Sequence, residues 1–215
     1  TTAAEVAKDI QVVHIPPFSG IGAEETRLVQ QEYQDLLIGQ GKPGDILRNL
    51  LLEVFDRRKE DKDDPSWDEL CQQVEDVFRY TLLPPQVEGR AFIVCEYLKG
   101  VPRKGHGNEG YARLDIATAG SGFLQVLLIL AFFYARPASV LLMDEPDAHL
   151  HVILQKQVYD QLRLIASRRK CQLLIATHSE VLIDNTGPGQ ILSFYRKPHP
   201  LITDTERDEV REAIK

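Results

Sequence analysis

The chain has 215 residues, of which 43% are hydrophobic and 27% charged, a composition typical of an ordinary soluble domain. Its net charge of −7 gives no general attraction to nucleic acid or to an anionic membrane surface. The longest apolar run, Val126 to Tyr134, is too short to span a bilayer, and three widely spaced cysteines favour a reducing compartment. We therefore expect a cytoplasmic protein with no membrane segment.

Helical patterns dominate the first part of the chain. They predict the tail of a helix, a short strand and three further helices at residues 1–9, 10–14, 24–38, 45–60 and 66–80. The last helix opens with Ser66 and Glu69 at the spacing of a capping box. Pro84-Pro85 ends this section, because proline interrupts a helix.

Strands and helices alternate in the rest of the chain. Strands are expected at 91–98 and 111–117, joined by a Gly- and Lys-rich loop that we expect to be mobile. A helix follows Gly122 and runs to about Ala135; apart from Gln125 it is apolar on all sides and should be buried.

A strand–helix–strand pattern then predicts parallel strands. It comprises strands 139–143 and 171–176 with helix 150–168 between them, and a strand at 190–195 is expected to complete the α/β core. One face of that helix carries an apolar stripe, formed by Leu150, Leu154, Val158, Leu162 and Ile165.

The patterns together predict one partial α/β domain over residues 1–215. Its parts are a helical lobe or insertion with flanking strands at about 10–118, the buried helix and α/β core at about 119–195, and a charged tail helix within 196–215.

Reactive side chains stand where two of the predicted strands end. Asp144 and Glu145 follow the first strand, and His178 follows the second. Because the ligand crevice of an open parallel sheet lies at the carboxyl ends of its strands, these side chains should converge there.

The residue types suit a Mg²⁺-nucleotide. Asp144 offers a hard oxygen ligand for the ion, Glu145 a second carboxylate to orient an attacking water, and His178 a contact to a terminal phosphate. In the alternative interpretation, the acidic run merely ends a strand and His178 caps the next helix. The two elements together make that alternative the weaker one.

Three segments resemble motifs of the ABC-type ATPases. Leu141-Leu-Met-Asp-Glu-Pro-Asp147 is similar to their Walker B and D-loop, and Ala176-Thr-His-Ser179 to their switch-histidine loop. Ala119-Gly-Ser-Gly-Phe-Leu-Gln125 resembles their signature at the start of its helix. By pattern, the nearest group is the OLD-like bacterial ATPases often filed as AAA family.

The resemblance implies a role for each of these positions. Asp144 would hold the Mg²⁺ shell, Glu145 would be the catalytic base and His178 the γ-phosphate sensor. The residues that would contact nucleotide are Gly120, Ser121, Gly122 and Asp147, the glycine-rich turn meeting the ATP of a second subunit. It implies a homodimer through an ATP sandwich, with DNA or an effector protein as possible partners.

The phosphate loop of such ATPases, Gly-x-x-x-x-Gly-Lys-Ser/Thr, does not occur in the 215 residues. We therefore expect the chain to be the carboxyl-terminal part of an ATPase whose phosphate loop lies upstream of Thr1. By itself this part should bind ATP weakly or not at all. Two alternatives stay open: a non-catalytic interaction module with an ABC-like core and, more weakly, a metal-dependent nuclease.

Overall fold

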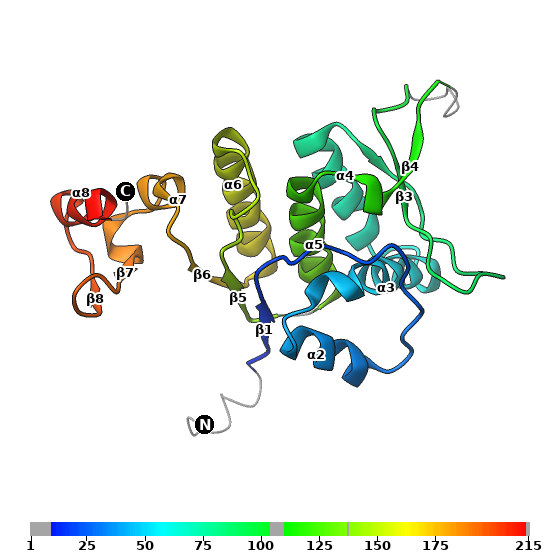
Figure 1. Ribbon diagram of the computed structural model, residues 1–215, viewed down its shortest axis with the longest axis horizontal. Helices are drawn as coiled ribbons and strands as arrows, with labels where there is room; N and C mark the ends of the chain where they lie inside the picture. Colours follow the sequence, from blue (N-terminus) through cyan, green and yellow to red (C-terminus); the bar gives the residue numbers. More distant parts are fainter. Residues whose placement is uncertain (1–9, 104–109, 137, 214–215) are drawn as a thin grey trace.

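The computed structural model describes residues 10–103, 110–136 and 138–213 (Figure 1). The helix tail predicted at residues 1–9 and residues 104–109 of the loop predicted at 99–110 lie outside these residues. Within them, no helix is both long enough and apolar enough to cross a membrane.

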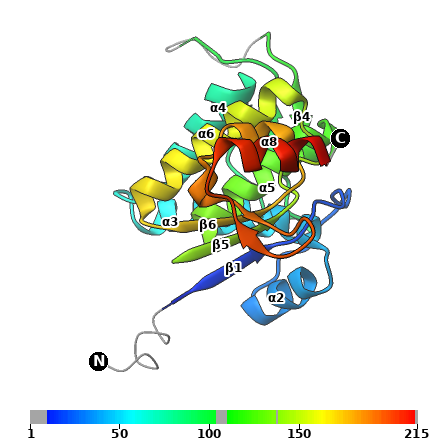
Figure 2. The ribbon, with the colours of Figure 1, turned by 90° about the vertical axis from the view of Figure 1, so that its left-hand side faces the viewer.

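A three-stranded parallel sheet forms the base of the molecule. It contains β1 (Val12–Ile15), β5 (Val140–Asp144) and β6 (Gln172–Ala176), in the order β1-β5-β6. Figure 2 shows α5 (Ser121–Ala135) and α6 (Val152–Arg169) on the same side of these strands. The predicted α/β fold with a parallel sheet is therefore confirmed.

The two faces of this sheet differ in burial. Side chains on the helix-covered face are buried, among them Ile15, Leu141 and Met143. On the other face Val12 is 55% exposed and Leu174 56% exposed. Strand residues alternate between faces, so this sheet has one covered and one open apolar side.

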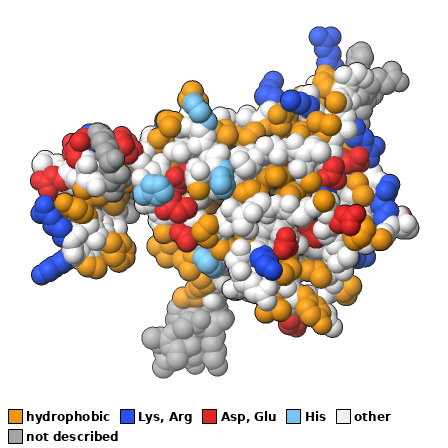
Figure 3. Space-filling view, in the orientation of Figure 1, with side chains coloured by type: hydrophobic (Ala, Val, Ile, Leu, Met, Phe, Trp, Pro, Cys, Tyr) orange, Lys and Arg blue, Asp and Glu red, His pale blue; other side chains and the backbone are white. Residues whose placement is uncertain are grey.

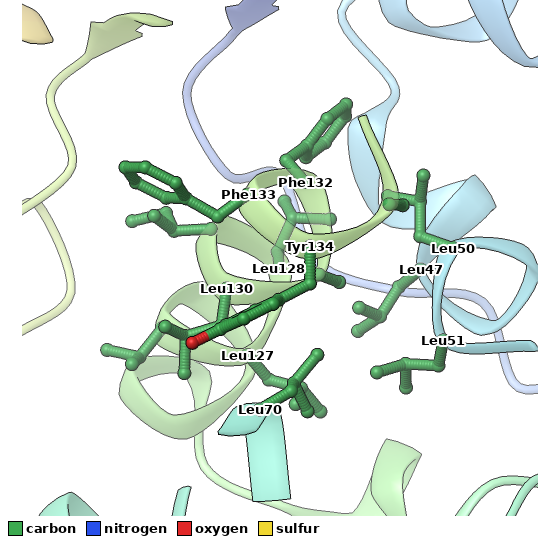
Figure 4. Packing of buried hydrophobic residues seen from close by; sticks show 14 of the residues in the cluster. Leu47, Leu50, Leu51, Leu70, Leu127, Leu128, Leu130, Phe132, Phe133 and Tyr134 are labelled. Carbon is green, nitrogen blue, oxygen red and sulfur yellow. The ribbon is translucent and has the colours of Figure 1, made fainter. Parts of the chain in front are cut away.

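Helix α5 lies at the centre of the helical lobe. All its residues from Phe123 to Ala135 are buried, as its uniform apolar character predicts. Leucines from α3 (Leu47–Glu60) and α4 (Ser66–Phe78) pack around it, as Figure 4 shows for Leu50 and Leu70. Three residues of the stripe predicted for α6 are buried, namely Val158, Leu162 and Ile165, whereas Leu154 is half-buried and Leu150 lies before the helix begins.

The helix predicted at 24–38 is wrong over its first part, since α2 covers only Gln31–Gly39. The Glu25 carboxylate accepts hydrogen bonds from the backbone N–H groups of Arg48 and Asn49, and the Leu28 N–H donates to the Asn49 side chain. These long-range bonds hold the segment extended against the start of α3, which a short 3₁₀ turn (Pro43–Ile46) precedes.

The capping box predicted at Ser66 is also wrong. Ser66 is the first residue of α4, and the preceding Pro65 is its N-cap. The Ser66 N–H donates to the Asp64 carboxylate, and its hydroxyl accepts from the Arg169 guanidinium. The Ser66 N–H is therefore engaged in a local turn and its hydroxyl in a tertiary contact, so neither forms a capping box.

A small antiparallel sheet precedes α5. It contains β2 (Thr81–Leu82), β3 (Glu96–Leu98) and β4 (Arg113–Asp115). The strands predicted at 91–98 and 111–117 are thus shorter than expected. The Ile93 N–H pairs with the Glu25 carbonyl instead of a strand, and Asp115 caps a 3₁₀ turn (Ile116–Thr118) that leads into α5.

The strand predicted at 190–195 does not complete the parallel core. Only β7 (Leu192–Ser193) is extended, and it pairs antiparallel with β8 (His199–Pro200). The chain folds back on itself here, through a turn in which Arg196 has a φ of 63°. This hairpin and α8 (Asp204–Ala213) lie beyond α7 (Glu180–Asp184), away from β5 (Figure 1). The predicted charged tail helix is confirmed as α8.

Candidate functional site

The loops after β5 and β6 begin at the same edge of the parallel sheet. Asp144 is the last residue of β5 and lies in register with Ala176, the last residue of β6. Histidine and acidic side chains gather on the face where these strands end (Figure 3). The register therefore brings the predicted polar residues of the two loops together.

Glu145 leaves the strand in an unusual backbone conformation. Its φ is 48°, the left-handed region, which costs a non-glycine residue roughly 1–2 kcal/mol. The Glu145 N–H still donates to the Ala176 carbonyl at 2.9 Å, so the chain turns immediately after this last ladder bond. The strain is concentrated at the residue predicted to be the catalytic base, as is common at functional sites.

His178 pairs with Glu145. The His178 Nδ1 atom lies 2.8 Å from a carboxylate oxygen of Glu145. The Glu145 carboxylate at this distance, together with the negative charge of Asp147, raises the pKa of His178 above its ordinary value. The His178 side chain is 75% exposed, so its ring can meet a ligand while remaining bound to the acid.

The Asp144 carboxylate is uncommitted. It is half-buried and has no hydrogen bond or ion pair among the residues that the structure describes. A cavity beside it, lined by Phe18, Gln125 and Pro146 among others, has a volume of ≈ 10 Å³, enough for about one water molecule. The carboxylate is therefore available, but these residues do not enclose a nucleotide.

Asp147 ties the two loops together. It is 6% exposed, and it accepts a hydrogen bond from the Thr177 hydroxyl at 2.6 Å. The Thr177 oxygen in turn accepts from the Ser179 N–H, and the Ser179 hydroxyl caps α7. Ser179, not His178, thus caps that helix. The predicted contact of Asp147 with nucleotide stays a prediction, and its carboxylate is engaged within the subunit.

A buried glutamine, Gln125, and a half-buried one, Gln155, complete the site, and neither was predicted to do so. Gln125 of α5 donates to the Glu145 carbonyl and accepts from the His149 N–H. Gln155 of α6 donates to the Leu150 carbonyl and accepts from the Ser179 hydroxyl. For Gln125 a signal did exist, because a lone amide in an apolar helix must find partners when buried.

The glycine-rich turn opens α5. Gly120 is the N-cap and makes no side-chain capping bond, and Gly120 and Ser121 are both exposed. A Cβ atom on Gly122 would lie 3.0 Å from the His149 carbonyl oxygen, so the helix start approaches the turn after β5 closely. Contact of these three residues with nucleotide stays a prediction.

Across the described ranges, no three or more His, Cys, Asp or Glu side chains are grouped to hold a metal ion. Asp144 could therefore supply one ligand of a cation that other groups also bind. Mg²⁺ suits such a site, because it is usually held by one or two carboxylates, water and substrate phosphates.

Comparison with known families decides what this arrangement belongs to. The family AAA_21, "AAA domain, putative AbiEii toxin, Type IV TA system", matches residues 18–184, which include Asp144, Glu145 and His178. The chain belongs to this family. Its members are ABC-like ATPases, so the predicted class is confirmed at family level, whereas the OLD-like group stays a prediction.

Solved structures give the same fold. One, from work on ATP-driven dimerization and DNA-stimulated activation of SMC ATPases, superposes with a TM-score of 0.50 at 17% identity, covering 69% of this chain and 92% of the other. An Smc head domain from Pyrococcus yayanosii gives 0.51 at 18% identity, covering 74% of this chain but only 32% of the other. No curated protein sequence matches. At these identities the likeness establishes the fold of an SMC-type head.

Proposed function

We propose that the chain is the carboxyl-terminal part of a Mg²⁺-dependent ATPase that binds and hydrolyses ATP between two copies. The observation that carries this proposal is the Glu145–His178 pair, 2.8 Å apart, next to the uncommitted carboxylate of Asp144. Side chains suited to act as a base, a phosphate contact and a metal ligand would thus share the carboxyl edge of one sheet, where α/β proteins bind ligands.

Asp144 fits the metal role on chemical grounds. Its oxygens are hard ligands, and the carboxylate has no other partner in the described parts of the chain. A bound Mg²⁺ would neutralise phosphate charge. The protein's own contribution would be to hold one side of the ion and to leave the remaining positions to water and phosphate oxygens.

Glu145 and His178 divide the remaining work. Glu145 would accept the proton of the attacking water, or orient that water, as a general base does. The raised pKa of His178 favours its charged form, which would donate a hydrogen bond to the terminal phosphate. Both roles require the geometry in which the two side chains are already paired.

The missing phosphate loop would be supplied by a segment upstream of Thr1. Within the described residues β6 pairs only with β5, so the backbone groups of its other edge have no strand partner. Such an open edge accepts a further strand readily. A parallel strand added there would end at the same edge as Asp144 and would deliver a phosphate loop to the site.

Dimerization and further partners are proposed by analogy. ATP-driven dimerization and DNA-stimulated activation are stated for the SMC ATPases that share this fold. For this chain we propose an ATP-dependent homodimer in which Gly120, Ser121 and Gly122 meet the nucleotide of the second copy. DNA or an effector protein would receive the resulting mechanical or signalling change.

The test is the Glu145→Gln variant of the full-length protein. We expect its ATP turnover to fall by about 10²–10⁴-fold, the usual contribution of a general base, while ATP is still bound. Without turnover, the ATP-bound dimer should persist in light scattering after gel filtration. Glu88→Gln, at an exposed loop position, is the matched control. Normal turnover by Glu145→Gln would contradict the role of Glu145.

A non-catalytic interaction module is the second candidate. The 215 residues lack a phosphate loop and the described residues form no enclosed nucleotide pocket, which are the observations in its favour. It predicts that full-length protein neither binds nor hydrolyses ATP, with isothermal titration calorimetry as the direct measurement.

A further inference from the structure

Gln125 is a polar residue in the middle of an apolar environment. It is 2% exposed, and every neighbour on α5 from Phe123 to Ala135 is also buried. Burying an amide is unfavourable unless both of its ends are hydrogen-bonded. Both ends of Gln125 are bonded, and both partners belong to the turn that follows β5.

The two bonds span the turn that begins with Glu145, the proposed catalytic base. The Nε2 group donates to the Glu145 carbonyl at 3.1 Å, and Oε1 accepts from the His149 N–H at 3.1 Å. The Glu145 carbonyl also accepts from the Ala148 N–H at 3.2 Å. The Glu145 carbonyl thus accepts two hydrogen bonds, one from Gln125 and one from Ala148. The far end of the turn, at His149, is held by the same Gln125 side chain.

This bracing acts on the residue with the strained backbone. Glu145 has a φ of 48°, which a glutamate leaves readily unless its surroundings hold it there. Rotation to a relaxed φ would turn the carboxylate away from His178, to which it is now bonded at 2.8 Å. Gln125 therefore bears on the direction of the acid without touching it.

We propose that Gln125 is a positioning residue that holds Glu145 in its left-handed conformation and so aims the carboxylate at His178 and the attacking water. The inference rests on the proposed ATPase function. Gln125 lies about one turn beyond Gly120–Gly122 on the same rigid helix. Gly120–Gly122 are predicted to contact the nucleotide of the second copy. Through this helix, Gln125 would couple that contact to the orientation of Glu145 in the same copy.

Gln125→Met in the full-length protein tests the proposal, because methionine keeps length and burial but removes both hydrogen bonds. We expect kcat to fall roughly 10- to 100-fold with KM nearly unchanged, since the acid is misplaced while ATP contacts remain. Amide exchange at His149 should speed up by about tenfold, the effect of one lost hydrogen bond. Gln73→Met, at another buried helical glutamine, is the control.

A second variant separates the two bonds. In its ionised form Gln125→Glu keeps an acceptor for the His149 N–H but has no donor for the Glu145 carbonyl. At a pH high enough to ionise this buried carboxyl, His149 exchange should stay slower than in Gln125→Met while kcat still falls. Wild-type kcat and wild-type His149 exchange in folded Gln125→Met would overturn the proposal. A parallel loss in Gln73→Met would do so too, because it would mark a general packing effect.

The exchange measurement also separates this inference from the proposed function. If wild-type protein turns over ATP no faster than Glu145→Gln, the proposed function fails and the catalytic part of this inference fails with it. Slow exchange at His149 that depends on Gln125 would still support the bracing of the turn.

Discussion

The ion pair between Arg48 and Asp115 predicts an asymmetry between two substitutions. Arg48 on α3 makes a two-pronged contact with Asp115, at 2.7 and 3.1 Å, just before the 3₁₀ turn that leads to Gly120. The Arg48 side chain is 1% exposed, whereas that of Asp115 is 37% exposed. If the pair is broken, the Asp115 carboxylate can be hydrated, whereas the Arg48 guanidinium cannot.

The magnitudes follow from this difference in burial. Asp115→Asn leaves a buried guanidinium facing an amide N–H₂ group, and breaking a buried pair in this way costs about 3–5 kcal/mol. We expect the lower end, about 3 kcal/mol, because the Glu25 carboxylate still attracts the Arg48 guanidinium. This carboxylate is buried and accepts hydrogen bonds from the Arg48 and Asn49 N–H groups. Arg48→Met removes the buried charge and leaves Asp115 partly hydrated, so it should cost only about 1 kcal/mol.

Urea unfolding provides the measurement, followed by the fluorescence of Trp67, the only tryptophan and a buried one. The double variant should be more stable than Asp115→Asn alone, because it no longer contains an unpaired buried cation. An Arg48→Met variant as destabilised as Asp115→Asn would refute the argument, and so would purely additive costs in the double variant.

Three further predictions concern the core and the site. Leu127→Ala, at a fully buried position of α5, should lower the free energy of unfolding by about 2–5 kcal/mol, and Leu164→Ala, at a 45% exposed position, by far less; urea unfolding compares them. Thr177→Val removes the donor to buried Asp147 and should cost about 1–3 kcal/mol in the same assay, unlike the exposed control Thr205→Val. The pKa of His178 should lie above the ordinary 6.5 in an NMR titration and return toward 6.5 in Glu145→Gln. Because the pKa is raised in the folded state, the Glu145–His178 pair stabilises the fold fully below about pH 6.5. This stabilisation is lost as the pH rises through the raised pKa. An unshifted His178 in the wild type would mean that the pair does not form in solution.

Elements whose pattern reflects their own burial were predictable from the sequence. The apolar helix α5, the striped helix α6 and the two strands flanking α6 match their predicted positions closely. The errors fall where distant groups compete for the backbone. The segment around Glu25 is not helical, because the Glu25 carboxylate is hydrogen-bonded to α3. Ser66 does not cap α4, because its hydroxyl is hydrogen-bonded to Arg169. No local pattern contains such partners.

The site divides in the same way. Convergence of Asp144, Glu145 and His178 followed from strand direction alone, because parallel strands end at one edge. The roles of Gln125 and Gln155 did not follow, since most of their partners are backbone atoms of turns whose shape the sequence does not specify. The left-handed φ of Glu145 was equally hidden, because glutamate carries no intrinsic preference for it.

Some polar side chains of the site are hydrogen-bonded within the subunit, whereas others have no partner or are exposed. This difference favours a site that other chain segments complete. Side chains that orient the loops are hydrogen-bonded, as Gln125, Asp147 and Thr177 are, and the first two are also buried. The groups proposed to touch nucleotide and metal are instead left accessible: Asp144 has no partner in the described ranges, and the His178 side chain is 75% exposed. A merely structural strand end would have no reason to keep Glu145 in a left-handed backbone conformation, since that conformation costs stability. A preorganised catalytic edge would, because groups fixed before the substrate arrives need no reorganisation during the reaction.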